Sequence, residues 1–220
     1  MDNYARARNR CRPAMQRFVM ARFPDTFTET GFLAPRKPSV PITRFQVVGE
    51  RSSGTNLLSR LIGRNSSLQS SEVLGWKHGF PQAVGIPPDL AVICVVRDAR
   101  NWALSMHRKP WHTGPEMQEL PFHKFIASPW NTFVDEDKYF RGAKRRGVLG
   151  QPLQLDRHPI TGARFENLFA LRHHKLVGML SYLNRQCNCV LLRAATVQAV
   201  PEETVDAILE ALQLPARSEP

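Results

Sequence analysis

A short apolar run, followed at once by a glycine-bounded turn and an amphipathic segment, constrains the fold of this chain most strongly. Residues 44–48 (RFQVV) have the composition of a strand and residues 49–54 (GERSSG) that of a turn. Residues 55–63 predict a helix, whose apolar positions share one face: Leu57, Leu58, Leu61 and Ile62. The pattern predicts a strand, a loop and a helix in succession.

A second unit of the same kind follows. Residues 91–96 (AVICVV) are typical of a parallel strand covered on both faces, and Asp98 stands at an N-cap-like position. A helix is expected over 99–107, because Pro110 forbids its continuation. Further along, we expect a weaker strand at 72–77, a helix at 165–184, a strand at 188–193 and a last helix that begins at Pro201. Strands that alternate with helices predict a three-layer α/β/α domain with a mainly parallel sheet, and ligands at the carboxyl ends of its strands.

Two segments lack this alternation. Residues 1–43 are basic and end in a proline-rich stretch, so we expect an arm or linker there and a domain over 44–220. Residues 109–161 mix prolines, glycines, aromatics and charges without a clear period, and contain a basic cluster at 138–146. So long an irregular segment in a compact domain is usually functional or mobile.

The net charge of the chain limits the class of binding partner but does not identify a single partner. The net charge of +11 and the sequence pI near 10.2 imply a polyanion: nucleic acid, an acidic membrane surface, or a phosphorylated or sulfated ligand. No apolar run is long enough for a membrane span and no secretory signal is visible, so we expect a soluble, cytoplasmic protein. The cysteines (Cys11, Cys94, Cys187 and Cys189) include no CxxC pair, and neither a zinc site nor a disulfide framework is expected.

The turn at 49–54 matches the GxxxxG half of a P-loop, in which backbone N–H groups curl around an anion at a helix N-terminus. Thr55 and Asn56 stand where the ATP- and GTP-binding version has lysine and a hydroxyl residue. A plain tight turn is the alternative. A cation could instead come from Arg97 at the end of the second apolar strand, with Ser105 about two helical turns beyond it, although an isolated arginine is commonly a paired surface residue.

Lys77 and His78 lie side by side at the end of the weaker predicted strand. They provide a cation for a developing negative charge and a base that titrates near neutrality. A lone histidine is more often structural.

Taken in order, SSGTN (52–56), WKHGFP (76–81) and VVRDARNWALS (95–105) resemble the PAPS-dependent sulfotransferases, with matching segments over about two thirds of the chain. The resemblance implies a P-loop NTPase-like fold and sulfuryl transfer from PAPS, leaving PAP, to an acceptor hydroxyl, without a metal. Carbohydrate, lipid headgroup and small alcohol stay open as acceptors, and no nucleic acid is expected.

The resemblance also assigns residues. The loop that would hold the 5′-phosphosulfate comprises Arg51, Ser52, Ser53, Gly54, Thr55 and Asn56. Arg51 would replace the lysine of the family's loop. Arg97 and Ser105 would hold the 3′-phosphate, and His78, beside Lys77, would deprotonate the acceptor.

Two other functions remain open from the sequence. A P-loop kinase lacks support because Thr55 occupies the lysine position and no Walker B aspartate is recognisable. A non-catalytic protein of the same fold would use the basic arm and the 138–146 cluster on nucleic acid or acidic glycan, but few aromatics interleave with those charges.

Overall fold

The computed structural model describes residues 22–217, and its centre is a five-stranded sheet in the order β1-β5-β4-β2-β3. Three parallel strands form its middle: β2 (Arg44–Gly49), β4 (Leu90–Val96) and β5 (Asn188–Arg193). The short β3 (Gln69–Ser70) runs parallel to β2, and β1 (Phe32–Leu33) pairs antiparallel with β5. The predicted α/β class with a mainly parallel sheet is confirmed.

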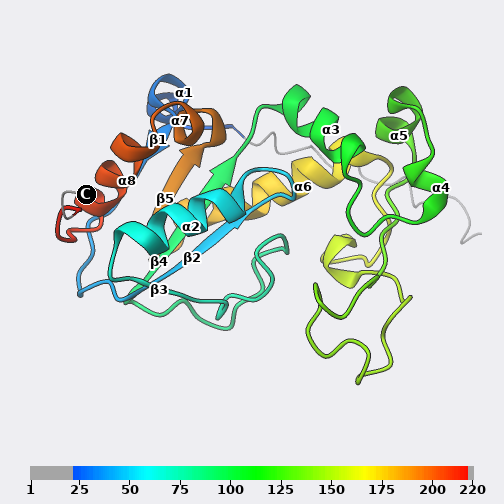
Figure 1. Cartoon of the computed structure of the whole chain (residues 1–220), viewed down its shortest axis with the longest axis horizontal. Helices are drawn as coiled ribbons and strands as arrows, with labels where there is room; N and C mark the ends of the chain where they lie inside the picture. The colour runs from blue at the N-terminus through cyan, green and yellow to red at the C-terminus, as the bar shows by residue number, and fades with distance from the viewer. Residues whose placement is uncertain (1–21, 218–220) are drawn as a thin grey trace, which may run out of the picture.

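Helices cover both faces of this sheet (Figure 1). On one face, α2 (Thr55–Asn65), α7 (Ala194–Ala199) and α8 (Pro201–Ala211) pack against alternate strand residues, which include Ile93 and Val95. On the other face, α6 (Leu168–Leu180) packs with α1 (Asp25–Thr30) and the 3₁₀ turn η2 (Ser181–Asn184) against the remaining residues, which include Val92 and Cys94. Burial on both faces explains why residues 91–96 are continuously apolar.

The strand predicted at 72–77 is wrong. Pairing with β2 is confined to Gln69–Ser70, and the chain then turns through Gly75, whose φ is 86°. The buried side chain of Gln46 explains the difference, because its Oε1 accepts from the Leu74 N–H at 2.9 Å and its Nε2 donates to the Gly75 carbonyl at 2.8 Å. A side chain thus satisfies backbone groups that a strand would have paired.

Part of the segment expected as an arm joins the sheet. Residues 25–33 form α1 and β1, and the Phe27 ring is buried in the core beside α6. Arg193, at the end of β5, donates to the carbonyls of Phe27 and Thr28. Cys11 and the arginines before residue 22 lie outside the described residues.

The segment predicted to be irregular builds a third core at the carboxyl end of the parallel strands (Figure 1, at right). It follows α3 (Ala99–Arg108) and contains α4 (Pro115–Gln118), α5 (Phe122–Ala127) and the 3₁₀ turn η1 (Gln154–Asp156). Trp102 and Met106 of α3 pack there on Phe125 and Trp130. Within residues 22–217, no helix is both long and apolar enough to cross a bilayer.

Gly49 ends β2 where no side chain fits. A Cβ atom there would lie 2.7 Å from both Ser53 Oγ and the Val95 carbonyl oxygen. Gly49→Ala should therefore lower the free energy of unfolding by about 1–3 kcal/mol, the usual cost of overpacking. Gly63→Ala is the control, because its Cβ would meet only the Phe45 ring at 3.9 Å inside helix α2, and it should raise stability by up to about 1 kcal/mol. Urea unfolding measures both, and equal effects would contradict this packing.

Candidate functional site

The loop between β2 and α2 turns its carbonyl groups inward. Two of its residues have left-handed backbone, Ser52 at φ 62° and Gly54 at φ 95°. Five of its carbonyl oxygens accept hydrogen bonds from within the protein. The Gly49 carbonyl accepts from His78 Nδ1 at 2.7 Å, the Arg51 carbonyl from Trp102 Nε1 at 2.8 Å, and the Ser52 carbonyl from Arg97 Nη1 at 2.9 Å. The Glu50 carbonyl accepts from Ser53 Oγ at 2.6 Å, and the Gly54 carbonyl from the Leu58 N–H at 3.1 Å. With these acceptors engaged, the groups left for a ligand are backbone N–H groups. Two of them are already used, because the Gly49 N–H donates to the Lys77 carbonyl at 3.0 Å and the Ser53 N–H to the Glu50 carbonyl at 3.2 Å.

The N-terminus of α2 continues this arrangement. No side chain caps it, and the first N–H groups of a helix have no intrahelical partner. The Lys77 ammonium lies beside it and donates to Asn56 Oδ1 at 2.5 Å. Burial lowers the pKa of Lys77, which marks a partly desolvated cation. Free amides, the positive end of a helix dipole and one ammonium group together make a site for an anion.

Arg97 lies where the sequence places it, at the end of β4, and its guanidinium reaches the loop through the Ser52 carbonyl. Its own carbonyl accepts from Arg172 Nη2 at 2.6 Å, which fixes the backbone at this strand end. Ser105 lies half-buried in α3. No contact between Ser105 and the loop is found among the described residues.

Arg51 is buried, and its charge is paired within the protein. Its guanidinium forms an ion pair with Asp156 at 2.5 Å, with its side chain only 5% exposed, and lies 5.7 Å from the ring centroids of both Trp76 and Trp130. The sequence predicted Arg51 as the loop's cation, whereas the cation that the structure brings to the start of α2 is Lys77.

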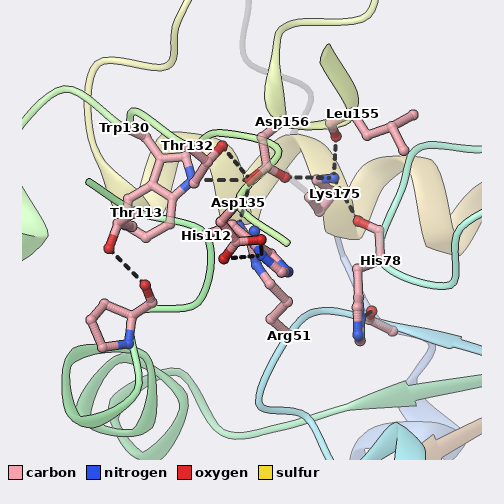
Figure 2. A network of polar contacts seen from close by, with 12 residues as sticks. Arg51, His78, His112, Thr113, Trp130, Thr132, Asp135, Leu155, Asp156 and Lys175 are labelled. Atoms are coloured by element: carbon pink, nitrogen blue, oxygen red, sulfur yellow. Dashed lines mark hydrogen bonds and ion pairs between the residues drawn. The ribbon is translucent and has the colours of Figure 1, made fainter. Parts of the chain in front are cut away.

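Asp156, from η1, is the centre of a buried polar network (Figure 2). Besides Arg51, its carboxylate accepts from Thr132 Oγ1 at 2.9 Å and Trp130 Nε1 at 3.3 Å, and lies 3.2 Å from Lys175 Nζ. Burial alone would raise the pKa of Asp156, but the charges of Arg51 and Lys175 outweigh it and hold this pKa well below its usual range. Asp156 is therefore ionised.

Lys175 extends the network from α6 to His78. Its Nζ donates to the backbone carbonyls of His78 and Leu155, at 2.6 Å each (Figure 2). Burial lowers the pKa of Lys175 to about 8. One ammonium group thus fixes the segment that carries His78 against the segment that carries Asp156.

One ring nitrogen of His78 is hydrogen-bonded to the backbone, and the other keeps its lone pair. Nδ1 faces the Gly49 carbonyl, so it carries the proton, and Nε2 keeps its lone pair. Burial lowers the pKa of His78 to about 3, with smaller contributions from Arg51, Lys77 and Lys175, so the ring is neutral at physiological pH. The Trp76 ring contacts it edge-on, with centroids 5.2 Å apart.

A second buried pair lies beneath the loop. Arg172 Nη1 is 3.1 Å from Glu50 Oε2, and the Arg172 guanidinium lies over Trp102 at 4.5 Å. Burial raises the pKa of Glu50 to about 8, against the opposing charges of Arg172, Lys175 and Arg51. A cavity of about 10 Å³ lies between Glu50, Arg51 and Asp156, close to the volume that one water molecule needs.

Sequence reasoning missed Glu50, Trp102, Asp156, Arg172 and Lys175. A signal existed for two of them, since Arg172 and Lys175 are charged residues within the apolar face of the predicted helix at 165–184. Charged side chains on a buried face are rare unless paired. For Asp156 and Glu50 the sequence offers no periodicity from which burial could be inferred.

Comparison with known proteins assigns no family. No protein-family model matches the chain, and no curated protein sequence matches it.

Removing Asp156 should be costly, because Arg51 and Lys175 would stay buried without their counter-charge. Asp156→Ala should lower the free energy of unfolding by about 3–5 kcal/mol at neutral pH. Its folded-state pKa is depressed, so this contribution is present above the unfolded aspartate pKa of roughly 4 and is lost as the pH falls. Urea unfolding from pH 7 to pH 3 measures it.

Asp206→Ala is the matched control, since Asp206 pairs with Arg217 on the surface and should contribute about 0–1 kcal/mol. If the two variants lose the same stability, the buried network is not the constraint described here.

Proposed function

We propose that this chain is a sulfotransferase with a P-loop-like nucleotide site, which moves a sulfuryl group from PAPS to an acceptor hydroxyl. The observation that carries the proposal is the loop at 49–56, whose carbonyls accept from protein donors, together with the start of α2, where Lys77 donates to Asn56 and no side-chain cap is found among the described residues. The resemblance of SSGTN, WKHGFP and VVRDARNWALS to that family supports the same conclusion.

The residues fit the phosphosulfate end of the donor. Ser52, Gly54, Thr55 and Asn56 would supply backbone donors, and Lys77 an ammonium group in place of the absent loop lysine. Ser53 would hold the loop in shape, because its N–H and its hydroxyl both donate to the Glu50 carbonyl. Arg51 would act indirectly, because its charge is paired with Asp156. Arg97, held against the Ser52 carbonyl, and Ser105 of α3 would bind the 3′-phosphate.

The remaining residues would act on the acceptor. Bound PAPS supplies the sulfuryl group and a phosphate leaving group. Lys77 stabilises negative charge that develops near the start of α2. His78, whose Nε2 keeps a lone pair, accepts a hydrogen bond from the acceptor hydroxyl and directs its oxygen toward the donor. The segment 109–161, which packs at the same strand ends, would form the acceptor pocket for a glycan, lipid headgroup or small alcohol.

The ligand preference tests this function directly. We expect PAP to bind without magnesium and more tightly than ATP or GTP, because Arg97 and Ser105 would contact a 3′-phosphate that the other nucleotides lack. Calorimetric titration of the full chain with each nucleotide, with and without magnesium, measures it. Equal affinities, or binding that depends on magnesium, would favour a P-loop kinase instead.

Arg97→Ala should weaken PAP binding by about 1.5–3 kcal/mol, the scale of a charged hydrogen bond. Arg100→Ala, which removes an exposed arginine from the first turn of α3, is the matched control and should leave the affinity unchanged. If both variants bind like the wild type, Arg97 does not contact the nucleotide.

A further inference from the structure

A histidine–carboxylate pair in the 109–161 segment stands apart from the nucleotide loop. His112 Nδ1 lies 2.9 Å from both carboxylate oxygens of Asp135 (Figure 2). A carboxylate accepts hydrogen bonds, so Nδ1 carries the ring proton and Nε2 keeps its lone pair. This is the arrangement by which an acidic residue fixes the tautomer and orientation of a catalytic histidine.

The backbone of His112 is in an unfavourable conformation. Its φ of 66° is in the left-handed region, which only a few per cent of non-glycine residues adopt, although asparagine, aspartate and histidine do so more often than others. Its carbonyl accepts from the Phe133 N–H at 2.8 Å, and the neighbouring Thr113 forms a β-bridge with Thr132. Strained backbone of this kind concentrates at functional sites, where the surrounding structure holds it in place.

The ring of His112 is enclosed by aromatic side chains but retains one open nitrogen. Its neighbours are Phe140, Tyr139, Trp76 and Trp111, with centroids 4.8, 5.4, 5.9 and 6.4 Å away. Among the described residues, Nε2 has no hydrogen-bond partner, yet it is not one of the fully buried unpaired atoms. The nitrogen therefore keeps some solvent exposure, although the side chain as a whole is only 6% exposed.

Trp76 connects this pair to His78. The indole contacts the His78 ring at 5.2 Å and the His112 ring at 5.9 Å. Both histidines thus adjoin one tryptophan, which directly precedes Lys77, the residue that donates to Asn56 at the start of α2. The two rings differ in what faces Nδ1: a carboxylate for His112 and a neutral carbonyl for His78.

We propose that His112, oriented by Asp135, is the general base of this site and that His78 positions the acceptor hydroxyl. The inference rests on the proposed sulfuryl transfer. The acceptor oxygen forms a bond to sulfur while the bond from sulfur to the bridging oxygen of PAPS breaks, and PAP leaves with that electron pair. The hydroxyl proton passes to Nε2 of His112. The step therefore balances, because PAP takes the electron pair of the broken bond and His112 takes the proton.

The electrostatics distinguish the two rings as proton acceptors. The groups that face His112 are Asp135, Arg51 and Asp156, together with the Tyr139 ring. Burial and Arg51 lower the pKa of His112 below its ordinary 6.5, whereas Asp135 and Asp156 raise it. Within residues 22–217, no carboxylate pairs with His78, and its pKa of about 3 disfavours a proton on that ring. The Asp135 carboxylate would stabilise the imidazolium that forms when His112 takes a proton, whereas Nδ1 of His78 faces only a neutral carbonyl.

A packing role for the pair makes different predictions. If Asp135 and His112 only hold the 135–140 turn in place, their loss should reduce stability and leave the pH dependence of the reaction unchanged. The test therefore needs a variant that keeps the fold. His112→Asn serves because asparagine tolerates the left-handed backbone at this position and provides no base. His123→Asn, in the exposed first turn of α5, is the matched control.

The experiment measures single-turnover transfer from radiolabelled PAPS to a probe acceptor, 2-naphthol, from pH 4 to pH 9, alongside calorimetric PAP affinity. We expect His112→Asn to bind PAP like the wild type and to transfer about 10²- to 10⁴-fold more slowly, whereas His123→Asn matches the wild type. The wild-type rate should fall as the pH drops through the pKa of His112, which burial holds below that of an ordinary histidine. This fall in rate at low pH is the acid limb of the pH–rate profile. Asp135→Asn should move the acid limb to lower pH, because it removes the carboxylate that raises the pKa of His112.

Each other outcome contradicts the proposal. A His112→Asn protein that transfers at the wild-type rate, or an Asp135→Asn protein with an unmoved acid limb, removes His112 as the base while sulfuryl transfer stands. If instead His78→Gln, and not His112→Asn, abolishes the acid limb, His78 is the base. A wild-type chain that binds no PAP and transfers nothing to the probe overturns the proposed function, and this inference with it.

Discussion

The buried carboxylate of Asp156, paired with Arg51 and Lys175, is the interaction on which the arrangement of this protein depends. Three segments that are far apart in the sequence each bring one charge into a volume from which water is nearly excluded. Ion pairs taken out of water add little net stability, but losing one member leaves an uncompensated charge. The network therefore acts less as a source of stability than as a constraint, because the loop after β2, helix α6 and η1 must pack so that their three charges meet.

The ion pairs of Asp156 also determine which charged groups lie near the loop at 49–56 and how His78 is oriented. Arg51 is held by Asp156, so the cation near the uncapped start of α2 is Lys77. Lys175 fixes the carbonyl of His78 while the Gly49 carbonyl fixes its ring, so both ends of this residue are set by groups outside it. The donor side and the acceptor side of the proposed reaction share Trp76, which contacts Arg51, His78 and His112.

Local pattern was enough to predict much of the fold. The strands at β2, β4 and β5 and the helices α2, α3, α6 and α8 follow from apolar periodicity and from N-terminal signals such as Asp98 and Pro201. The strand predicted at 72–77 failed because its pairing is replaced by the side chain of Gln46, a tertiary contact that no local pattern contains. Residues 109–161 could not be predicted either, since their order comes from a core built around Trp102, Phe125 and Trp130 rather than from a repeating period.

In the candidate site, too, some features could be predicted from local sequence pattern and others are set by tertiary contacts. Spacing predicted Arg97, Lys77, His78 and the loop at the ends of adjacent strands. Lys77 and His78 lie in a turn and not at a strand end, but the structure still brings them and Arg97 to that loop. The orientation of Arg51 was beyond the sequence, because it is set by Asp156 from a segment without a pattern. His112 and Asp135 are 23 residues apart, and only the folded chain reveals them as a pair.

If the loop at 49–56 binds a phosphorylated nucleotide through its backbone amides, those amides should respond when the nucleotide is added. Backbone amide NMR of the full chain during titration with PAP measures this response. We expect saturable shifts that are largest at Gly54, Thr55 and Asn56, unchanged by magnesium. Shifts that centre elsewhere while those three amides stay unmoved at saturating PAP would contradict this mode of binding.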